Sequence, residues 1–143
     1  PNDTYDNIFG GNLLFDNLGK LYLSVGSAND NNRAQDLHSL KGKILRLDVS
    51  KSKLEPEIVA YGIRTPWGGT IDSKDRMFIL PCGASVLEAG YLLNDLYSGI
   101  PANLGWPIFE GSYRTRKDPL IFDGNRFCME QRSFGPRGPR DPS

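Results

Sequence analysis

The chain has 143 residues, enough for one domain, and its 17 basic and 17 acidic side chains leave no net charge. This balance provides no field that would attract nucleic acid or an anionic membrane surface. No apolar run approaches the ~20 residues needed to span a bilayer, and two cysteines, Cys82 and Cys128, cannot form a metal cluster by themselves.

The first predicted element is a β-hairpin over residues 10–26. Its apolar side chains recur at alternate positions in both arms, at Leu13, Phe15, Leu21, Leu23 and Val25. Residues 16–19 (Asp-Asn-Leu-Gly) supply the turn, because Asn and Gly tolerate the positive φ that a tight reversal needs. Residues 69–80 repeat this plan of strand, Asp-led turn and strand, so we predict a repeated all-β architecture.

The remaining elements follow in chain order. Residues 27–40 are predicted as a polar loop, 42–49 as a strand with Leu47 and Val49 inward, and 57–62 as a short strand. Residues 63–69 are expected to form a loop, because Pro66 excludes helical geometry at Thr65. A strand is predicted near 90–94, no helix is convincing, and the region from Ser112 onward shows no clear organisation. We predict that residues 1–132 form the folded part and that 133–143, rich in Pro, Gly and Arg, are a disordered tail.

On pattern alone, a β-propeller and a β-sandwich fit these hairpins equally well. At roughly 45 residues per blade the chain holds about three blades, whereas a closed propeller needs about four or more. The chain is therefore expected to be part of a longer protein, a sandwich-like unit, or a propeller segment that closes with a partner.

Four ordered motifs resemble the glucose/sorbosone dehydrogenase family. They are the hairpin at 10–26, residues 32–37 (Asn-Arg-Ala-Gln-Asp-Leu) with 42–48 (Gly-Lys-Ile-Leu-Arg-Leu-Asp), residues 61–67 (Tyr-Gly-Ile-Arg-Thr-Pro-Trp), and residues 103–107 (Asn-Leu-Gly-Trp-Pro) with Glu110 and Gly111. The resemblance implies a six-bladed β-propeller, of which this chain covers about three blades, that oxidises aldose sugars with pyrroloquinoline quinone (PQQ) and calcium. We further expect a secreted or periplasmic protein.

The resemblance places the catalytic base of the family at Ile8 and the acid that orients this base at Ser27, and neither side chain can perform that role. No catalytic residue is therefore assigned. The single histidine, His38, lies in a loop where the family uses none, and we interpret it as a solvated surface group rather than a base.

Arg64 and Thr65 are the candidate cofactor-binding residues. Arg64 matches the family's cofactor-facing arginine, whose fixed charge can stabilise a reduced quinone, but it fits a structural tie to neighbouring carbonyls equally well. Thr65 replaces the family's Asn and so loses an amide.

Gly83 and Glu88 are the candidate calcium ligands. The family's acidic segment reads Pro-Cys-Gly-Ala here, at residues 81–84, and offers only carbonyls. Glu88 remains from the acidic pair that follows, while Ala89 replaces the second acid.

Two further groups admit both functional and structural readings. Trp67 and Trp106 could stack on a sugar, but tryptophans buried between blades are commoner. The polar side chains of residues 32–36 are interpreted as organisers of their loop rather than cation ligands.

Three functions therefore remain open: a segment of a quinoprotein sugar dehydrogenase, a non-catalytic propeller that serves as a binding or interaction module, and an assembly component whose open blades pair with a protein partner. We favour the first, with a partial or catalytically degenerate site.

Overall fold

In the computed structural model, the described residues are 11–28, 30–83, 89–115 and 131–133. They form an all-β structure with one short 3-10 helix, η1 (Asn31–Ala34), which confirms the predicted fold class. The strands are β1 (Leu13–Phe15), β2 (Leu21–Val25), β3 (Lys43–Leu47), β4 (Glu57–Tyr61), β5 (Thr65–Ile71), β6 (Met77–Cys82), β7 (Ala89–Leu93), β8 (Ala102–Asn103), β9 (Phe109–Glu110), β10 (Tyr113–Arg114) and β11 (Gln131–Ser133).

The first sheet has the order β1-β2-β3-β4-β8, and its first four strands run up and down in chain order. The predicted hairpin forms as expected: Asp16 and Lys20 close the turn through a backbone hydrogen bond of 3.1 Å, and Gly19 takes a φ of 76°. The Asp16 carboxylate also accepts hydrogen bonds from the N–H groups of Leu18 and Lys20, at 2.9 and 2.8 Å. The side chain therefore stabilises the reversal from inside the turn.

The second sheet has the order β11-β7-β6-β5. Asp72 repeats the turn chemistry, since its carboxylate accepts from the N–H groups of Lys74 and Arg76 at 2.9 and 3.0 Å. β5 is the edge strand, which explains how it accommodates Pro66, a residue without a backbone donor. The register of β5 against β6 shifts between Pro66 and Gly68, as in a β-bulge.

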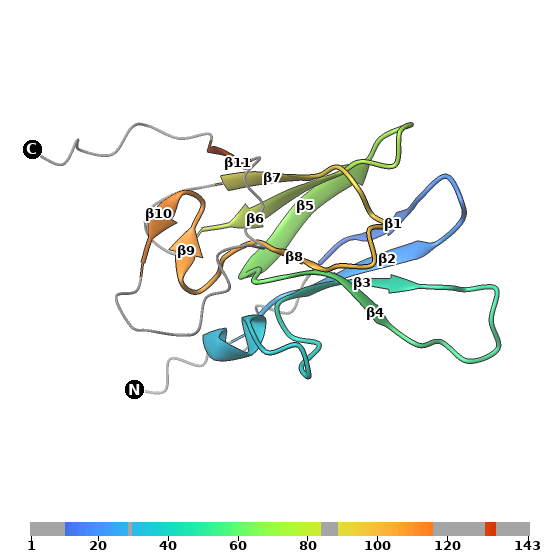
Figure 1. Ribbon diagram of the computed structural model, residues 1–143, viewed down its shortest axis with the longest axis horizontal. Helices are drawn as coiled ribbons and strands as arrows, with labels where there is room; N and C mark the ends of the chain where they lie inside the picture. The colour runs from blue at the N-terminus through green and yellow to red at the C-terminus, as the bar shows by residue number, and fades with distance from the viewer. Residues whose placement is uncertain (1–10, 29, 84–88, 116–130, 134–143) are drawn as a thin grey trace, which may run out of the picture.

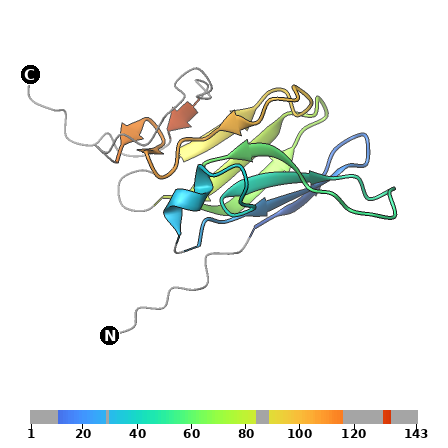
Figure 2. The same ribbon diagram turned by 60° about the horizontal axis from the view of Figure 1, so that its bottom comes forward.

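The two sheets pack face to face (Figures 1 and 2). The shared core is formed by Tyr22, Ile44, Val59, Ala60, Ile63, Met77, Ile79, Ala89, Tyr91, Leu93, Leu96 and Leu104. In most strands these positions alternate, as strand geometry requires, but Val59 and Ala60 are consecutive in β4, where the register against β3 shifts as in a β-bulge. In the predicted hairpin, however, Tyr22 and Ser24 face this core, while Leu13, Phe15, Leu21 and Leu23 lie on the opposite face of the sheet.

That opposite face distinguishes the two architectures that the sequence left open. In a β-sandwich, the strands alternate apolar inward and polar outward. Here the first sheet carries apolar rows on both faces, with Leu13 opposite Leu23 and Phe15 opposite Leu21. Sheets that are apolar on both faces are built to be covered on both sides, as propeller blades are.

Side chains at the hairpin turns join the sheets. Asn17 Nδ2 donates to Asp75 Oδ1 at 2.7 Å, which locks one hairpin turn against the other. Tyr97, in the connection after β7, donates its hydroxyl to the Asp16 carboxylate, and Tyr22 donates to the same carboxylate at 3.0 Å. Burial raises the pKa of Asp16, but the hydrogen bonds outweigh it and leave this pKa below its usual value.

Some boundaries predicted from the sequence were wrong. The predicted loop at 63–69 contains the start of β5, because the edge position and the bulge admit Pro66 into a strand. Leu47 and Val49 do not point inward as predicted, because Leu47 pairs with Leu21 on the face away from the core, and Val49 lies beyond the end of β3 and is exposed. The polar loop at 27–40 includes η1, and the region after Ser112 includes β10 and β11.

Other predictions fall only partly on the described residues. Ser133 is the last residue of β11, where it pairs with Ala89, and the rest of the predicted tail lies outside the described part of the chain. Ile8, Glu88 and Cys128 also lie outside it. None of the described helical residues forms a segment long and apolar enough to cross a membrane.

Candidate functional site

β2, β4 and β6 end at one end of the two sheets, where the connections to β3, β5 and β7 begin, opposite the hairpin turns (Figure 2). Up-and-down strands produce this arrangement, because every second connection returns to the same end. Ser27, Arg64 and Gly83 each follow the strand that enters one of these connections, so the structure brings three predicted site positions together. η1 and the β9–β10 hairpin lie at the same end.

A pocket at this end encloses about 20 Å³. Its walls are Gly62, Ile63, Arg64, Pro81, Cys82, Gly83, Ala89, Tyr91, Trp106, Phe109, Glu110 and Gly111. This volume suffices for one water molecule, whereas sites that enclose a small organic ligand measure ~300 Å³ or more. The described residues at this end therefore do not enclose a ligand of the size of a sugar or a quinone.

Arg64 is the cationic residue of this wall. It is half-buried, its Nη1 donates to the carbonyl oxygen of Gly83 at 2.9 Å, and its Cζ lies 5.6 Å from the ring centroid of Trp106. The carbonyl and the aromatic ring together fix the orientation of the guanidinium plane. Since this bond to Gly83 uses one of five N–H donors, the group retains donors for an anionic ligand.

Trp106 is buried and connects Arg64 to the first sheet. Its Nε1 donates to Asn31 Oδ1 at 3.1 Å, and the Ser27 hydroxyl donates to the same oxygen at 3.2 Å. The Ser27 N–H donates to the carbonyl of Arg64 at 2.8 Å, so Ser27 is bonded both to the backbone of Arg64 and to the asparagine that binds Trp106. The predicted acid position is thus a fully buried neutral alcohol that supports the arginine loop.

The predicted loop-organising role of residues 32–36 agrees with the contacts of Gln35. Its Nε2 donates to the carbonyl of Trp106 at 2.6 Å and to Asn103 Oδ1 at 3.1 Å, while Asn103 Nδ2 donates back at 2.9 Å. These bonds pass directly over Gly62, where a Cβ would lie 2.6 Å from Gln35 Nε2. Gly62, with a φ of 77°, therefore meets both a conformational and a steric requirement.

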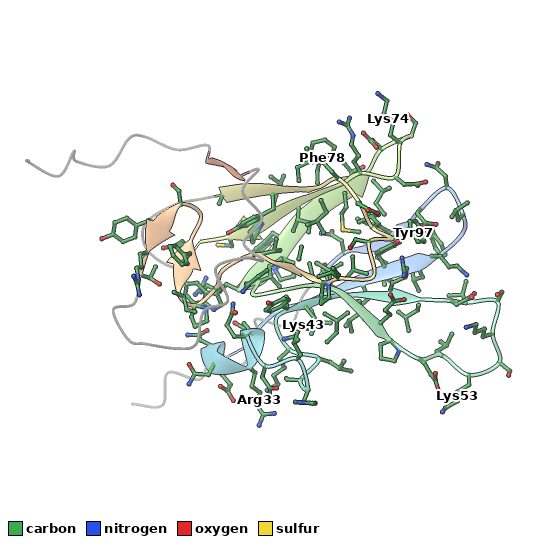
Figure 3. All side chains as sticks on the ribbon, in the orientation of Figure 1. Arg33, Lys43, Lys53, Lys74, Phe78 and Tyr97 are labelled. Atoms are coloured by element: carbon green, nitrogen blue, oxygen red, sulfur yellow. The ribbon has the colours of Figure 1, made fainter. Side chains whose placement is uncertain are left out.

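Sequence reasoning missed Lys43, which is fully buried at the start of β3 (Figure 3). Its Nζ donates to the carbonyl oxygens of Arg33, Ala34 and Lys41 at 2.8, 3.0 and 2.7 Å. Burial lowers the pKa of Lys43 to about 8, and the charge of Asp36 opposes this shift. The available signal was a lysine placed between Gly42 and the apolar residues of a predicted strand.

Thr65 is nine-tenths buried beside Arg64, and among the described residues its Oγ1 has no hydrogen-bond partner. Buried hydroxyls are normally paired, because an unpaired one loses its hydration without compensation. An orphaned hydroxyl next to an oriented guanidinium is compatible with a pair of groups that a polar ligand completes.

The calcium prediction finds no support in this donor set. The Gly83 carbonyl accepts from Arg64, and the S–H of Cys82 donates to it at 3.5 Å, so donors already occupy the candidate ligand atom. Within the described ranges, no three His, Cys, Asp or Glu side chains converge as a metal site would require. Hard cations require several oxygen ligands, and the described part of this end does not supply them.

His38, Trp67 and Trp106, the other residues considered in the sequence, differ in how exposed their side chains are. His38 is exposed, as predicted for a surface group. Trp106 is buried as the structural interpretation expected, but Trp67 is 74% exposed and does not wedge the two sheets together. The reason is that Trp67 lies on the edge strand, at the bulge in β5.

Comparison with known proteins identifies the family. Residues 1–124 match the sequence profile of the glucose/sorbosone dehydrogenases, which is most of the chain. The chain belongs to the glucose/sorbosone dehydrogenase family. Its all-β sheets are part of the propeller of that family, as predicted.

Individual relatives agree with this assignment. The chain is similar to the aldose sugar dehydrogenase YliI of Escherichia coli, with 38% identity over 120 residues that cover 76% of this chain and 31% of the relative. It is 34% identical to the HIPL2 protein of Arabidopsis thaliana over 140 residues, which cover 76% of this chain and 20% of that protein. The chain therefore spans less than a third of either relative.

A solved structure shows the same fold. The PQQ-bound aldose sugar dehydrogenase of Streptomyces coelicolor matches with a TM-score of 0.63 and 26% identity, over 87% of this chain and 35% of that one. Of the predicted site positions that the structure describes, Arg64 and Thr65 present polar groups at this end, Ser27 is a buried alcohol, and the Gly83 carbonyl accepts from Arg64.

Proposed function

We propose that this chain forms one wall of the cofactor site of a PQQ-type aldose sugar dehydrogenase, with Arg64 and Thr65 facing the quinone. The observation that carries the proposal is the pairing of an oriented, half-buried guanidinium with an orphaned, buried hydroxyl on adjacent residues. PQQ is a carboxylated quinone, so a fixed cation and a hydroxyl donor suit its anionic and carbonyl oxygens.

The same proposal assigns binding rather than catalysis to this chain. The quinone, when bound, supplies the acceptor for the two electrons and the hydrogen removed from an aldose. Removal of the hydroxyl proton requires a base, and the family's base position holds Ile8, which has no proton-accepting atom. Ser27 cannot orient a base as a carboxylate would, because its hydroxyl is buried and donates to Asn31. The chain alone is therefore expected to bind the quinone without oxidising sugar.

The test is a titration of the chain with PQQ, followed by quenching of tryptophan fluorescence, since Trp106 stacks beside Arg64. Arg64→Ala should weaken binding about tenfold or more, because it removes a charged donor group. Lys74→Ala is the charge-matched control, since this lysine is exposed at the opposite end of the sheets (Figure 3). Equal affinity of the two variants would refute the assignment of Arg64.

Thr65→Val supplies an independent readout, because valine keeps the shape of threonine and removes the hydroxyl. Without PQQ, the variant should unfold at the same or a higher urea concentration, since an unpaired buried hydroxyl is lost. With PQQ, its affinity should fall several-fold. Unchanged affinity would show that Thr65 does not contact the quinone.

Catalysis is tested separately by dye reduction with glucose, PQQ and calcium. No dye reduction at high protein concentration is the expected result, and turnover would overturn the assignment of a degenerate site. The proposal includes a secreted or periplasmic location, which fractionation of the source cells tests.

A second candidate function is an interaction module, and it rests on the apolar outer face of the first sheet, where Leu13 and Phe15 are 65% and 60% exposed. Such faces mark protein contact surfaces when they are contiguous and exposed.

A further inference from the structure

The turn that carries Trp106 is held by side chains from the segment around η1. The Trp106 N–H donates to the carbonyl oxygen of Gly62 at 2.9 Å, and its own carbonyl oxygen accepts from Gln35 Nε2 at 2.6 Å. The indole Nε1 donates to Asn31 Oδ1 at 3.1 Å. Separate contacts therefore fix the two parts of Trp106, with Gln35 on its carbonyl oxygen and Asn31 on its ring.

The contact of Gln35 is specific, because its amide fits the network in one orientation. Asn103 Oδ1 accepts from the Gly105 N–H at 2.9 Å, and Asn103 Nδ2 donates to Gln35 Oε1 at 2.9 Å. The Nε2 of Gln35 then faces two acceptor oxygens, Asn103 Oδ1 at 3.1 Å and the carbonyl oxygen of Trp106 at 2.6 Å. Gln35 is half-buried and Asn103 is buried, so the loss of these bonds is not simply replaced by bonds to water.

The contact reaches Arg64 through the ring of Trp106. The Cζ of Arg64 lies 5.6 Å from the centroid of this ring, and its Nη1 donates to the carbonyl oxygen of Gly83 at 2.9 Å. A guanidinium that is held by one hydrogen bond and one ring face changes its orientation when the ring moves. Gln35 does not line the pocket beside Arg64, so it influences the arginine through Trp106 rather than by direct contact.

We propose that Gln35 is a positioning residue of the candidate cofactor site, whose amide N–H groups orient Trp106 and, through this ring, the guanidinium of Arg64. The inference rests on the proposed function, in which Arg64 binds an anionic group of a quinone. The hydrogen-bond donor is the required feature, rather than the size of the side chain. An acceptor atom in the place of Nε2 would face the oxygens of Asn103 and Trp106 and repel both.

Gln35→Glu tests the donor, because glutamate keeps the shape of glutamine. At pH 7 the ionised carboxylate places an oxygen where Nε2 stood, 2.6 Å from one acceptor oxygen and 3.1 Å from another. Their repulsion raises the pKa of the introduced carboxyl above the ~4.3 of an ordinary glutamate. At about pH 4.5 the protonated carboxyl can donate its O–H to the carbonyl oxygen of Trp106, which restores the contact.

Two measurements follow the positions of Trp106 and Arg64 rather than the stability of the fold. The first is the pair of ¹⁵N–¹H resonances from the Trp106 indole and the Arg64 guanidinium; the chain has one other tryptophan, whose signal Trp67→Phe identifies. Gln35→Glu should shift both resonances at pH 7 and return them, at about pH 4.5, to those of the original protein at the same pH. The second is the dissociation constant for PQQ. Relative to the original protein it should rise about tenfold at pH 7 and about twofold or less near pH 4.5.

Asn17→Asp is the matched control in the hairpin turn at the opposite end of the sheets. Asn17 Nδ2 also donates to two acceptor oxygens, Asp75 Oδ1 at 2.7 Å and the carbonyl oxygen of Asp72 at 3.3 Å, so an aspartate creates the same kind of repulsion. This variant should lower the urea midpoint at pH 7 and leave both resonances and the PQQ dissociation constant unchanged. Gln35→Met removes the donor without adding a charge, and it should shift the resonances at both pH values. It decides the question if Gln35→Glu fails to fold at pH 7, as far-UV circular dichroism would show.

Three results would overturn the proposal. In the first, Gln35→Glu and Gln35→Met leave both resonances unchanged. In the second, Asn17→Asp shifts them as far as Gln35→Glu does, because the effect is then a general loss of stability. In the third, the shift in Gln35→Glu persists at low pH, because packing and not the donor is then responsible. If the original protein does not bind PQQ, the proposed function fails, whereas the two resonances still decide whether Gln35 positions Arg64.

Discussion

Replacement of Lys43 by methionine should destabilise the protein strongly, although methionine preserves most of the packing. The ammonium group donates to three backbone carbonyls at 2.7–3.0 Å from a fully buried position. Hydrogen bonds to a charged group contribute about 1.5–3 kcal/mol each, so three give roughly 5–9 kcal/mol before the cost of burying the charge.

The cost of burial follows from the pKa. A shift of the Lys43 pKa from 10.5 to about 8 corresponds to about 3 kcal/mol at 1.36 kcal/mol per pH unit. The net loss of unfolding free energy in Lys43→Met is therefore roughly 2–6 kcal/mol. Because the bonds fix the segment between η1 and β3, the loss should also loosen the loop that holds Trp106.

Urea denaturation measures this effect as a fall in midpoint of about 1 M or more at an unchanged m-value. Lys53→Met is the matched control, since the Lys53 side chain is 83% exposed. Its unfolding free energy should change by about 0.5 kcal/mol or less. Equal midpoints for the two variants would refute the conclusion that the buried ammonium stabilises the fold.

Three further predictions follow. The pKa of Asp16 lies below the 3.8 of an ordinary carboxyl, so its stabilising contribution is present above about pH 4 and is lost as the pH falls through the folded-state value. Asp16→Asn should therefore lower the free energy of unfolding by about 1–3 kcal/mol at pH 7, and this free energy should fall less steeply below pH 4 in the variant than in the original protein. An equally steep fall in both proteins would contradict this prediction. Gly62→Ala should lower the free energy of unfolding by about 3 kcal/mol or more, measured by thermal or urea denaturation. Gly19 has a similar φ but nothing within 4 Å of the new Cβ, so Gly19→Ala should lower it by only about 1–2 kcal/mol. Similar losses for the two variants would show that small movements relieve the crowding around Gly62. Trp106→Phe keeps a ring beside Arg64 but removes the donor to Asn31, and should cost about 1 kcal/mol, measured by urea denaturation; no loss would argue against the Nε1 hydrogen bond.

Local chemistry made the strands and turns predictable from the sequence. The turns at 16–19 and 72–75 are led by aspartates whose carboxylates accept backbone N–H groups, and this is a short-range interaction that residue order reveals. β3 and β4 followed from alternation in the same way. β5 was placed less well, because whether a strand tolerates proline depends on its edge position in the sheet, which is not a local property.

The candidate site was only partly predictable. Up-and-down topology brings Ser27, Arg64 and Gly83 to one end, so their proximity followed once the strands were known. The stack of Arg64 on Trp106 depends on loops that meet only in three dimensions, through Asn31 and Gln35. The burial of Lys43 depends on how the segment after η1 folds back, since its ammonium group binds the carbonyls of residues 33, 34 and 41. No periodic pattern marks such contacts, because the loops that make them have no regular repeat.

β8 belongs to the later half of the chain but lies in the first sheet, where Ala102 and Asn103 pair in parallel with Ala60 and Tyr61 of β4. The segment that crosses back carries Leu96, whose carbonyl accepts from Arg46 of β3 at 2.7 Å. A cut at the β4–β5 connection would consequently leave the early fragment without its last strand. The two sheets should melt in a single cooperative transition rather than as separable modules.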